Sequence, residues 1–217
     1  MLDEKVFSRQ LDIISPENLQ KEILIIGTGG VGSVTALTLA KIGCSNLKLI
    51  DDDKVAIHNI PSQFFAPSQS GKPKVEAISE TLEHFMEVKP EIINEKWSDE
   101  TAPIMILAVD SMATRKEIYE SLKGNFMVER MIEARMSAEK MRIYSIIPSD
   151  EDDQRKYEKT LYTDEEASEE KCTAKAIAYN TFIIGGLITS IVKKHLANEE
   201  MIFELIFNLE DYSFYVG

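Results

Sequence analysis

The residues best suited to chemistry lie near the start of the chain, in a glycine cluster that follows an apolar run. Ile23-Leu-Ile-Ile26 has the composition of a buried strand, and Gly27-Thr-Gly-Gly-Val-Gly32 follows it directly. Four of the ten glycines fall within these six positions, so chance is a poor explanation. A strand, a glycine turn and a helix present backbone N–H groups to an anion at the helix N-terminus. The segment therefore predicts a phosphate-binding site.

Each glycine of this segment has its own expected role. We expect Gly27 to make the tight turn, Gly29 to let the backbone approach a phosphate, and Gly32 to let the helix pack closely on the strand. A second apolar strand ends at Asp51, where a carboxylate can accept hydrogen bonds from ribose hydroxyls. The pattern indicates a nucleotide, and on this segment alone NAD and ATP explain it about equally well.

The composition is that of an ordinary soluble globular protein. The chain has 217 residues, 44% of them hydrophobic and 28% charged, so it can bury a core as a single domain over 1–217. Its net charge of −13 opposes nucleic acid binding, which needs clustered Lys and Arg. No uncharged apolar run approaches ~18 residues, so no membrane span is expected.

Cysteine usage and the N-terminus indicate a reducing cytoplasm. The first residues lack the basic and then apolar pattern of a secretory signal. The two cysteines, Cys44 and Cys172, form neither a disulfide framework nor a C-x-x-C metal clip. Cys44 lies in the turn after the first predicted helix, and we expect it to be structural.

Hydrophobic periodicity predicts alternating strands and helices through most of the chain. We expect a lead-in helix within 1–20, a strand-helix-strand unit over 23–53, an irregular loop over 54–71, a helix over 72–88 and a strand around 92–93. Further strands are expected at 103–110, 129–134 and 141–147, with a helix at 113–122. A helix at 174–196 and two short strands within 202–216 follow.

This alternation predicts an α/β fold with a doubly wound, Rossmann-like, mostly parallel sheet and a C-terminal antiparallel strand extension. The segment 149–171 is long, acidic and poor in large aliphatic residues, so we expect a flexible crossover loop. Gly185-Gly186 predicts close packing of the last helix against a neighbour. Ligands of such sheets bind beyond the carboxyl ends of the strands, where Gly27, Asp51 and Asp110 fall.

Two further residues favour ATP over NAD. Lys74 starts the helix after the irregular loop, and Asp110 ends its own strand at the nucleotide edge. A dehydrogenase needs neither of them. Transfer of AMP to a carboxylate places charge on the α-phosphate and on the departing pyrophosphate, so it requires a positive side chain and a carboxylate that holds Mg²⁺.

Five motifs in order resemble the E1-like adenylating family, which includes the ThiF, MoeB and HesA enzymes and the adenylation domains of ubiquitin-activating enzymes. They are Arg9-Gln10, the glycine loop, Asp51-Asp-Asp-Lys-Val55 with Asn59, Gly71-Lys-Pro-Lys74, and Asp110 with Arg115. Each motif is weak alone, but together they cover most of the chain in register.

The resemblance implies ATP with Mg²⁺ on Asp110, and a substrate that is the C-terminal tail of a ubiquitin-like or sulfur-carrier protein. It implies that Arg9 reaches the site of a partner subunit, hence a homodimer or an E1-like heterodimer. Catalytic roles would fall to Arg9, Lys74, Asp110 and Cys172. The implied nucleotide-binding set is Gly27, Gly29, Gly30, Gly32, Asp51, Asp53, Asn59 and Gln63.

Two departures from the family pattern are visible. Where relatives read N-L-x-R-Q, this chain reads Asn59-Ile-Pro-Ser-Gln63, so Ser62 replaces a catalytic arginine. Lys72, Arg115 and Arg135 are candidates to supply the missing charge. The paired C-x-x-C zinc ligands of many relatives are also absent, so no zinc is expected.

Cys172 lies just before the last helix, where some relatives carry a cysteine that takes a thioester or acyl-disulfide. A helix N-terminus lowers a thiol pKa and favours the nucleophilic thiolate, whereas the neighbouring Glu169 and Glu170 oppose this effect.

Two rival functions remain at this stage. A non-catalytic E1-like subunit that donates Arg9 to an active partner would account for Ser62. An NAD-dependent oxidoreductase would account for Gly27 to Asp51 but leaves Arg9, Lys74 and Asp110 without a role.

Overall fold

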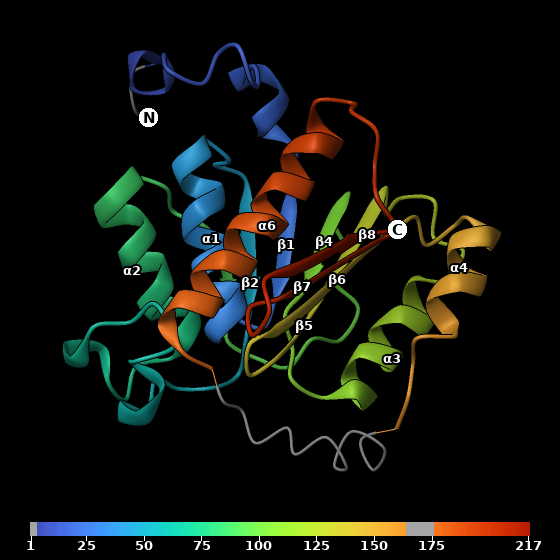
Figure 1. Ribbon diagram of the computed structural model, residues 1–217. Helices are drawn as coiled ribbons and strands as arrows, with labels where there is room; N and C mark the ends of the chain where they lie inside the picture. Colours follow the sequence, from blue (N-terminus) through green and yellow to red (C-terminus); the bar gives the residue numbers. More distant parts are fainter. Residues whose placement is uncertain (1–3, 164–175) are drawn as a thin grey trace.

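The computed structural model describes residues 4–163 and 176–217, which build one eight-stranded sheet (Figure 1). The strand order is β3-β2-β1-β4-β5-β6-β7-β8. The strands are β1 (Ile23–Ile26), β2 (Leu47–Ile50), β3 (Glu91–Ile93), β4 (Ile104–Leu107), β5 (Arg130–Ser137), β6 (Lys140–Ile146), β7 (Glu204–Asn208) and β8 (Ser213–Val216). The strands from β3 to β5 pair in parallel, and β6, β7 and β8 add antiparallel pairs. The predicted parallel sheet with an antiparallel extension is confirmed.

Helices cover both faces of this sheet. They are α1 (Gly30–Ile42), α2 (Lys74–Met86), α3 (Met112–Leu122), α4 (Glu151–Glu158) and α6 (Ala178–Leu196), with short 3-10 helices η1 (Glu4–Phe7), η2 (Pro16–Gln20), η3 (Ile57–Asn59) and η4 (Pro67–Gln69). In Figure 1, α1, α2 and α6 lie on one face, and α3 and α4 on the other. None of the helices in the described ranges combines the length and apolarity needed to cross a membrane.

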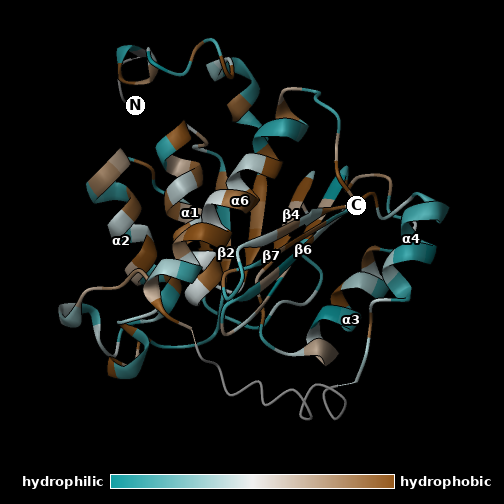
Figure 2. Cartoon of the chain, in the orientation of Figure 1, coloured by the Kyte–Doolittle hydropathy of each residue, from teal (hydrophilic) through white to brown (hydrophobic). Residues whose placement is uncertain are grey.

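The core is divided by the sheet into two layers. Side chains of β1 alternate, so that Ile23 and Ile25 join the cluster under α1, α2 and α6, whereas Leu24 and Ile26 join the cluster under α3 and α4. All four side chains are buried. In Figure 2 the central strands β1 and β4 are coloured as hydrophobic, whereas the outlying helix α4 is largely hydrophilic. Burial on both faces explains why β1 is a continuous apolar run.

The long helix α6 lies tightly against α1. A Cβ on Gly185 would stand 2.8 Å from Val34 Cγ1, so only glycine allows this approach. The hydroxyls of Thr38 and Thr189 are hydrogen-bonded across the interface at 2.6 Å. The predicted close packing of this helix is confirmed at Gly185, while a Cβ on Gly186 would meet nothing within 4 Å.

Two predicted elements differ from the structure. Residues 4–20 form η1, a run of turns and η2 instead of one lead-in helix. The apolar residues do not share one buried face, since Ile14 is buried while Leu11 and Ile13 are exposed. The acidic segment 149–171 is not a loop throughout. Its residues 151–158 form α4, whose first amides are capped by Asp150 at 2.9 Å and whose Tyr157 is buried.

Candidate functional site

The glycine loop joins β1 to α1 and is fixed by very close backbone contacts. Gly27 has a φ of 88°, and a Cβ on it would stand 2.8 Å from the Ala108 carbonyl oxygen. A Cβ on Gly32 would stand 1.8 Å from the Gly27 carbonyl oxygen, so the helix start packs directly on the turn. Gly29 is the N-cap residue of α1, and the nearest side chain to the position of its missing Cβ is that of Gln63. The loop therefore presents the N-terminus of α1 to a ligand.

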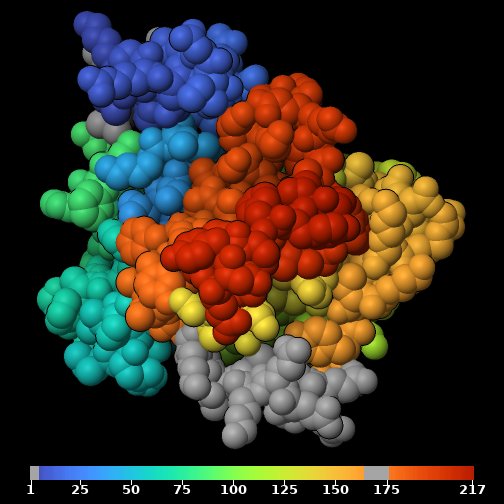
Figure 3. All heavy atoms as spheres, viewed as in Figure 1, coloured from blue at the N-terminus to red at the C-terminus, as the bar shows by residue number. Residues whose placement is uncertain are grey.

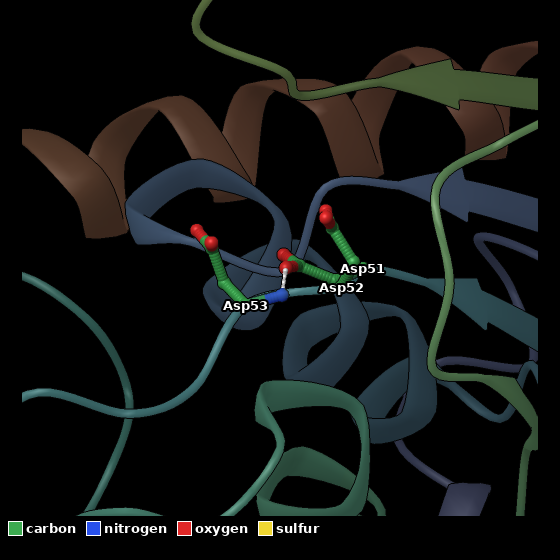
Figure 4. Close-up of side chains that lie close together, drawn as sticks. All are labelled: Asp51, Asp52 and Asp53. Atoms are coloured by element: carbon green, nitrogen blue, oxygen red, sulfur yellow. Dashed lines mark hydrogen bonds between the residues drawn. The ribbon is translucent and has the colours of Figure 1, made fainter.

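Asp51 is attached to this loop. Its Oδ2 accepts hydrogen bonds from the Thr28 amide at 2.6 Å and the Thr28 hydroxyl at 3.1 Å, and its Oδ1 accepts one from the Asp53 amide at 2.9 Å. A carboxylate has about four acceptor sites, so one is still available to a ribose hydroxyl. Figure 4 shows the Asp51, Asp52 and Asp53 side chains leaving the turn after β2.

Lys74 lies at the same turn. Its buried side chain forms an ion pair with Asp53, with 2.6 Å between Nζ and Oδ2, and its backbone amide donates to the Asp53 carbonyl at 2.9 Å. The loop 54–73 returns the chain to this point, where Lys54 and Pro73 form an isolated bridge. The ammonium group thus lies at the turn after β2, where the Asp53 carboxylate balances its charge.

The segment around Ser62 covers the start of α1. A Cβ on Gly30 would stand 3.3 Å from the Ser62 carbonyl oxygen, and the Phe64 amide donates to Ser33 Oγ at 3.0 Å. Gln63 Nε2 lies 3.7 Å from the position of a Cβ on Gly29, and Gln63 Oε1 is buried without a hydrogen-bond partner among the described residues. Asn59 is used locally, because its Oδ1 accepts from the Ala56 amide at 3.2 Å.

Asp110 follows β4 at the same edge of the sheet. The Ala108 amide donates to the Ile26 carbonyl at 2.8 Å, which holds the end of β4 against the glycine loop two residues before Asp110. Asp110 is exposed. A solvent-accessible carboxylate beside a phosphate-binding loop suits Mg²⁺, which keeps several water ligands and takes few protein ones.

The three cations considered in place of the arginine missing at Ser62 have other partners. Lys72 forms an exposed ion pair with Glu80 at 2.6 Å. Arg115 and Arg135 both contact the fully buried Glu133. No role for Glu133 or for the Thr28 side chain follows from the sequence alone. A charged residue inside the apolar strand 130–134 and a hydroxyl within the glycine loop were the available signals.

Arg9 lies at the other end of α1. Gln10 Nε2 donates to the Ile42 carbonyl at 2.5 Å, and Phe7 packs at Gly43, which ends the helix. Because α1 has 13 residues, it separates this segment from the glycine loop by about 20 Å. Figure 3 shows the N-terminal segment standing out at one end of the molecule. The structure therefore does not bring the exposed Arg9 to the glycine loop of its own chain.

The structure describes one of the two cysteines, Cys44. Cys44 is buried, and this burial raises the pKa of its thiol to about 12. Cys172 lies outside the described residues. A cavity of about 680 Å³ is lined by Ser62 and Gln63 among other residues, and its lining includes the aromatic side chains of Phe64, Phe85 and Phe182.

The fold and this edge are those of an α/β protein with a candidate phosphate-binding loop, and comparison with known proteins gives its family. The ThiF family matches residues 7–212, and the chain belongs to it.

Its curated relatives include ubiquitin-like modifier-activating enzyme 5 of Culex quinquefasciatus, 48% identical over 65 residues, and that of Caenorhabditis elegans, 44% identical over 73 residues. These matches cover 30% and 34% of this chain, but only 16% and 17% of the relatives.

Solved structures with the same fold extend over nearly the whole chain. PaaA superposes with a TM-score of 0.77 at 20% identity, covering 99% of this chain and 72% of PaaA. E. coli MccB with ATP gives 0.76 at 17% identity, covering 99% of this chain and 71% of MccB. MccB has also been solved with MccA, at 0.76 and 17% identity.

Proposed function

We propose that this chain binds Mg-ATP at the glycine loop and adenylates the C-terminal carboxylate of a ubiquitin-like protein, a sulfur-carrier protein or a peptide. The observation that supports the proposal best is the pair of hydrogen bonds from Thr28 to Asp51, which ties to the glycine loop a carboxylate able to accept from a ribose hydroxyl. Membership in the ThiF family and the ATP complex of the structural neighbour MccB support it.

In the proposed reaction a carboxylate oxygen of the substrate attacks the α-phosphorus of ATP. The bond from this phosphorus to the oxygen that bridges to the β-phosphate breaks, and pyrophosphate leaves with the electron pair. Asp51 orients the ribose, and Lys74 leaves Asp53 to stabilise negative charge on the phosphates. Asp110 would hold the Mg²⁺ ion, which neutralises phosphate charge when bound.

The position of Arg9 supports a role in trans. The arginine lies at the far end of α1, so we propose that it completes the site of a second subunit, in a homodimer or an E1-like heterodimer. Chains carrying Arg9→Ala and chains carrying Asp110→Ala should each be inactive. When mixed, they should regain activity, because one site then has both residues. Absence of complementation would contradict sharing of the site.

Carrier-dependent exchange of radiolabelled pyrophosphate into ATP tests the reaction itself, with ubiquitin-like and sulfur-carrier proteins and peptides offered in turn. Wild type should catalyse exchange with one class only, and Lys74→Ala should abolish it. A chain that binds Mg-ATP but exchanges with none of them would contradict the adenylation step.

A second candidate function is favoured by Ser62. In a non-catalytic subunit that lends Arg9 to an active partner, the chain's own site needs no arginine at this position. Ser62 lies over Gly30, so an arginine introduced there can reach the glycine loop. A large gain of exchange in Ser62→Arg would favour the non-catalytic subunit, whereas no gain would favour catalysis without this arginine. Transfer of the activated group to Cys172 is a further proposal, and its test is loss of transfer but not of exchange in Cys172→Ser.

A further inference from the structure

The buried Glu133 carboxylate lies between two arginines, one of which reaches the residue before Asp110 and the other the residues after α4. Its Oε1 accepts hydrogen bonds from Arg115 and from Arg135 Nε, the latter at 3.0 Å. Its Oε2 accepts from Arg135 Nε at 2.9 Å and from the Tyr157 hydroxyl at 3.2 Å. Glu133 is fully buried, and both arginine side chains are at most one-tenth exposed. A buried charge of this kind is retained only with close, geometrically good partners.

Arg115 connects this carboxylate to the loop that carries Asp110. Besides Glu133, its guanidinium donates to the Val109 carbonyl and, at 2.7 Å, to the Ala134 carbonyl. Val109 directly precedes Asp110. The guanidinium therefore holds the peptide group that precedes Asp110, while Asp110 itself is exposed to solvent.

Arg135 leads from the same carboxylate to the residues after α4. Its Nη1 donates to the Thr160 carbonyl at 2.7 Å and its Nη2 to the Thr160 hydroxyl at 3.1 Å. The guanidinium also lies over the rings of Tyr144 and Tyr162, at 4.7 and 5.5 Å from their centroids. Burial alone would lower the pKa of Arg135, but the charge of Glu133 raises it above the ordinary value, so the side chain is charged.

We propose that Glu133 is a positioning residue that orients the magnesium ligand Asp110 through Arg115, and that it holds the chain after α4 through Arg135 as a separate arm. The first of these roles, through Arg115, rests on the proposed function. Its consequence is specific to magnesium, because Asp110 is the proposed magnesium ligand. Loss of the Arg115 contact displaces the Asp110 peptide and weakens the magnesium-dependent part of ATP affinity. The hydrogen bond from the Ala108 amide to the Ile26 carbonyl does not depend on Arg115, so we expect the glycine loop to keep its metal-free affinity for ATP.

Arg115→Lys and Arg135→Lys form a matched pair. Each variant keeps a positive charge beside Glu133. Arg115→Lys removes the guanidinium hydrogen bond to the Val109 carbonyl, and Arg135→Lys removes the one to the Thr160 carbonyl. The measurement is the ratio of the ATP dissociation constant in EDTA to that in Mg²⁺. We expect this ratio to fall about tenfold in Arg115→Lys, as for other residues that orient a metal ligand, and to stay at the wild-type value in Arg135→Lys.

Hydrogen exchange provides a readout that needs no ligand. Amides within 108–111 should exchange faster in Arg115→Lys only, and amides within 160–163 faster in Arg135→Lys only. Equal changes of the two variants in the ratio of ATP dissociation constants, or in hydrogen exchange, would mean that Glu133 has only a general structural role. Either result would overturn the proposal. If wild type fails to bind Mg-ATP, the proposed function fails and the magnesium role with it. Faster hydrogen exchange confined to the expected segment of each variant would still establish the two separate connections of Glu133, through Arg115 and through Arg135.

Discussion

The carboxylate of Asp51 accepts a hydrogen bond from the Thr28 amide at 2.6 Å, so the end of β2 is tied to the middle of the glycine loop. The two residues are 23 positions apart and are brought together by the parallel pairing of β1 with β2. Because the same carboxylate retains a free acceptor site, the proposed ribose contact would need no reorientation of Asp51 when a nucleotide binds.

Asp51→Asn should weaken ATP binding about tenfold, the value of one hydrogen bond to a charged group. An amide presents an NH₂ group to one of the three donors that now face Asp51, so the side chain must turn away from its present position. Titration calorimetry with Mg-ATP measures the effect. Asp52→Asn, at the exposed neighbouring position, is the matched control and should bind as wild type does. Equal affinities of the two variants would contradict a role for Asp51.

Gly32→Ala should destabilise the chain by about 1–3 kcal/mol, because the new Cβ would overlap the Gly27 carbonyl oxygen and push the glycine loop out of place. Gly186→Ala, on the exposed side of α6, should instead stabilise by about 0.5–1 kcal/mol, since nothing lies within 4 Å of its Cβ. Urea denaturation of both variants gives the comparison. A Gly32→Ala variant as stable as wild type would show that the loop can relax at little cost.

Cys44 should not react with thiol reagents in the native protein. Its burial raises the pKa of the thiol to about 12, so the nucleophilic thiolate is scarce at pH ~8. Ellman's reagent applied to Cys172→Ser isolates this residue. We expect labelling only after denaturation, and rapid labelling of the folded variant would mean that Cys44 is accessible.

The free energy of unfolding should decrease as the pH falls through the titration range of His195. Burial, followed by the charge of Arg130, lowers its pKa below 6.5, with Lys21 acting in the same direction and Glu129 opposing. The unfolded state then binds more protons, so this stabilisation is complete above 6.5 and is lost as pH falls through the folded pKa. His195→Gln should flatten the slope of unfolding free energy between pH ~7.5 and ~5.5. An unchanged slope would assign it to other groups.

The sequence predicts those parts of the fold that depend on local pattern. The apolar run 23–26 with its glycine turn specifies a buried strand and a helix start, and the same reasoning places Asp51 and Asp110 at one edge. The pairing of Thr28 with Asp51 was not predictable, because it depends on strand register and side-chain rotamers.

Tertiary contacts also account for the other features of the structure that the sequence does not predict. The position of Arg9 follows from the packing of Phe7 and Gln10 on the end of α1, which no periodicity reveals. The helix α4 was missed because its sequence is highly charged and only Tyr157 is buried. Glu133 carries no local signal beyond one acid in an apolar strand, since its partners come from separate elements.

Thermal unfolding of the purified chain with Mg-ATP and, separately, with NAD tests the nucleotide site most directly. A ligand at ~100 times its dissociation constant adds about 2.7 kcal/mol to the free energy of unfolding, which is several degrees for a chain of this size. We predict stabilisation by Mg-ATP and not by NAD, with a smaller shift in Asp110→Ala. Stabilisation by NAD without a response to Mg-ATP would contradict an adenylating site.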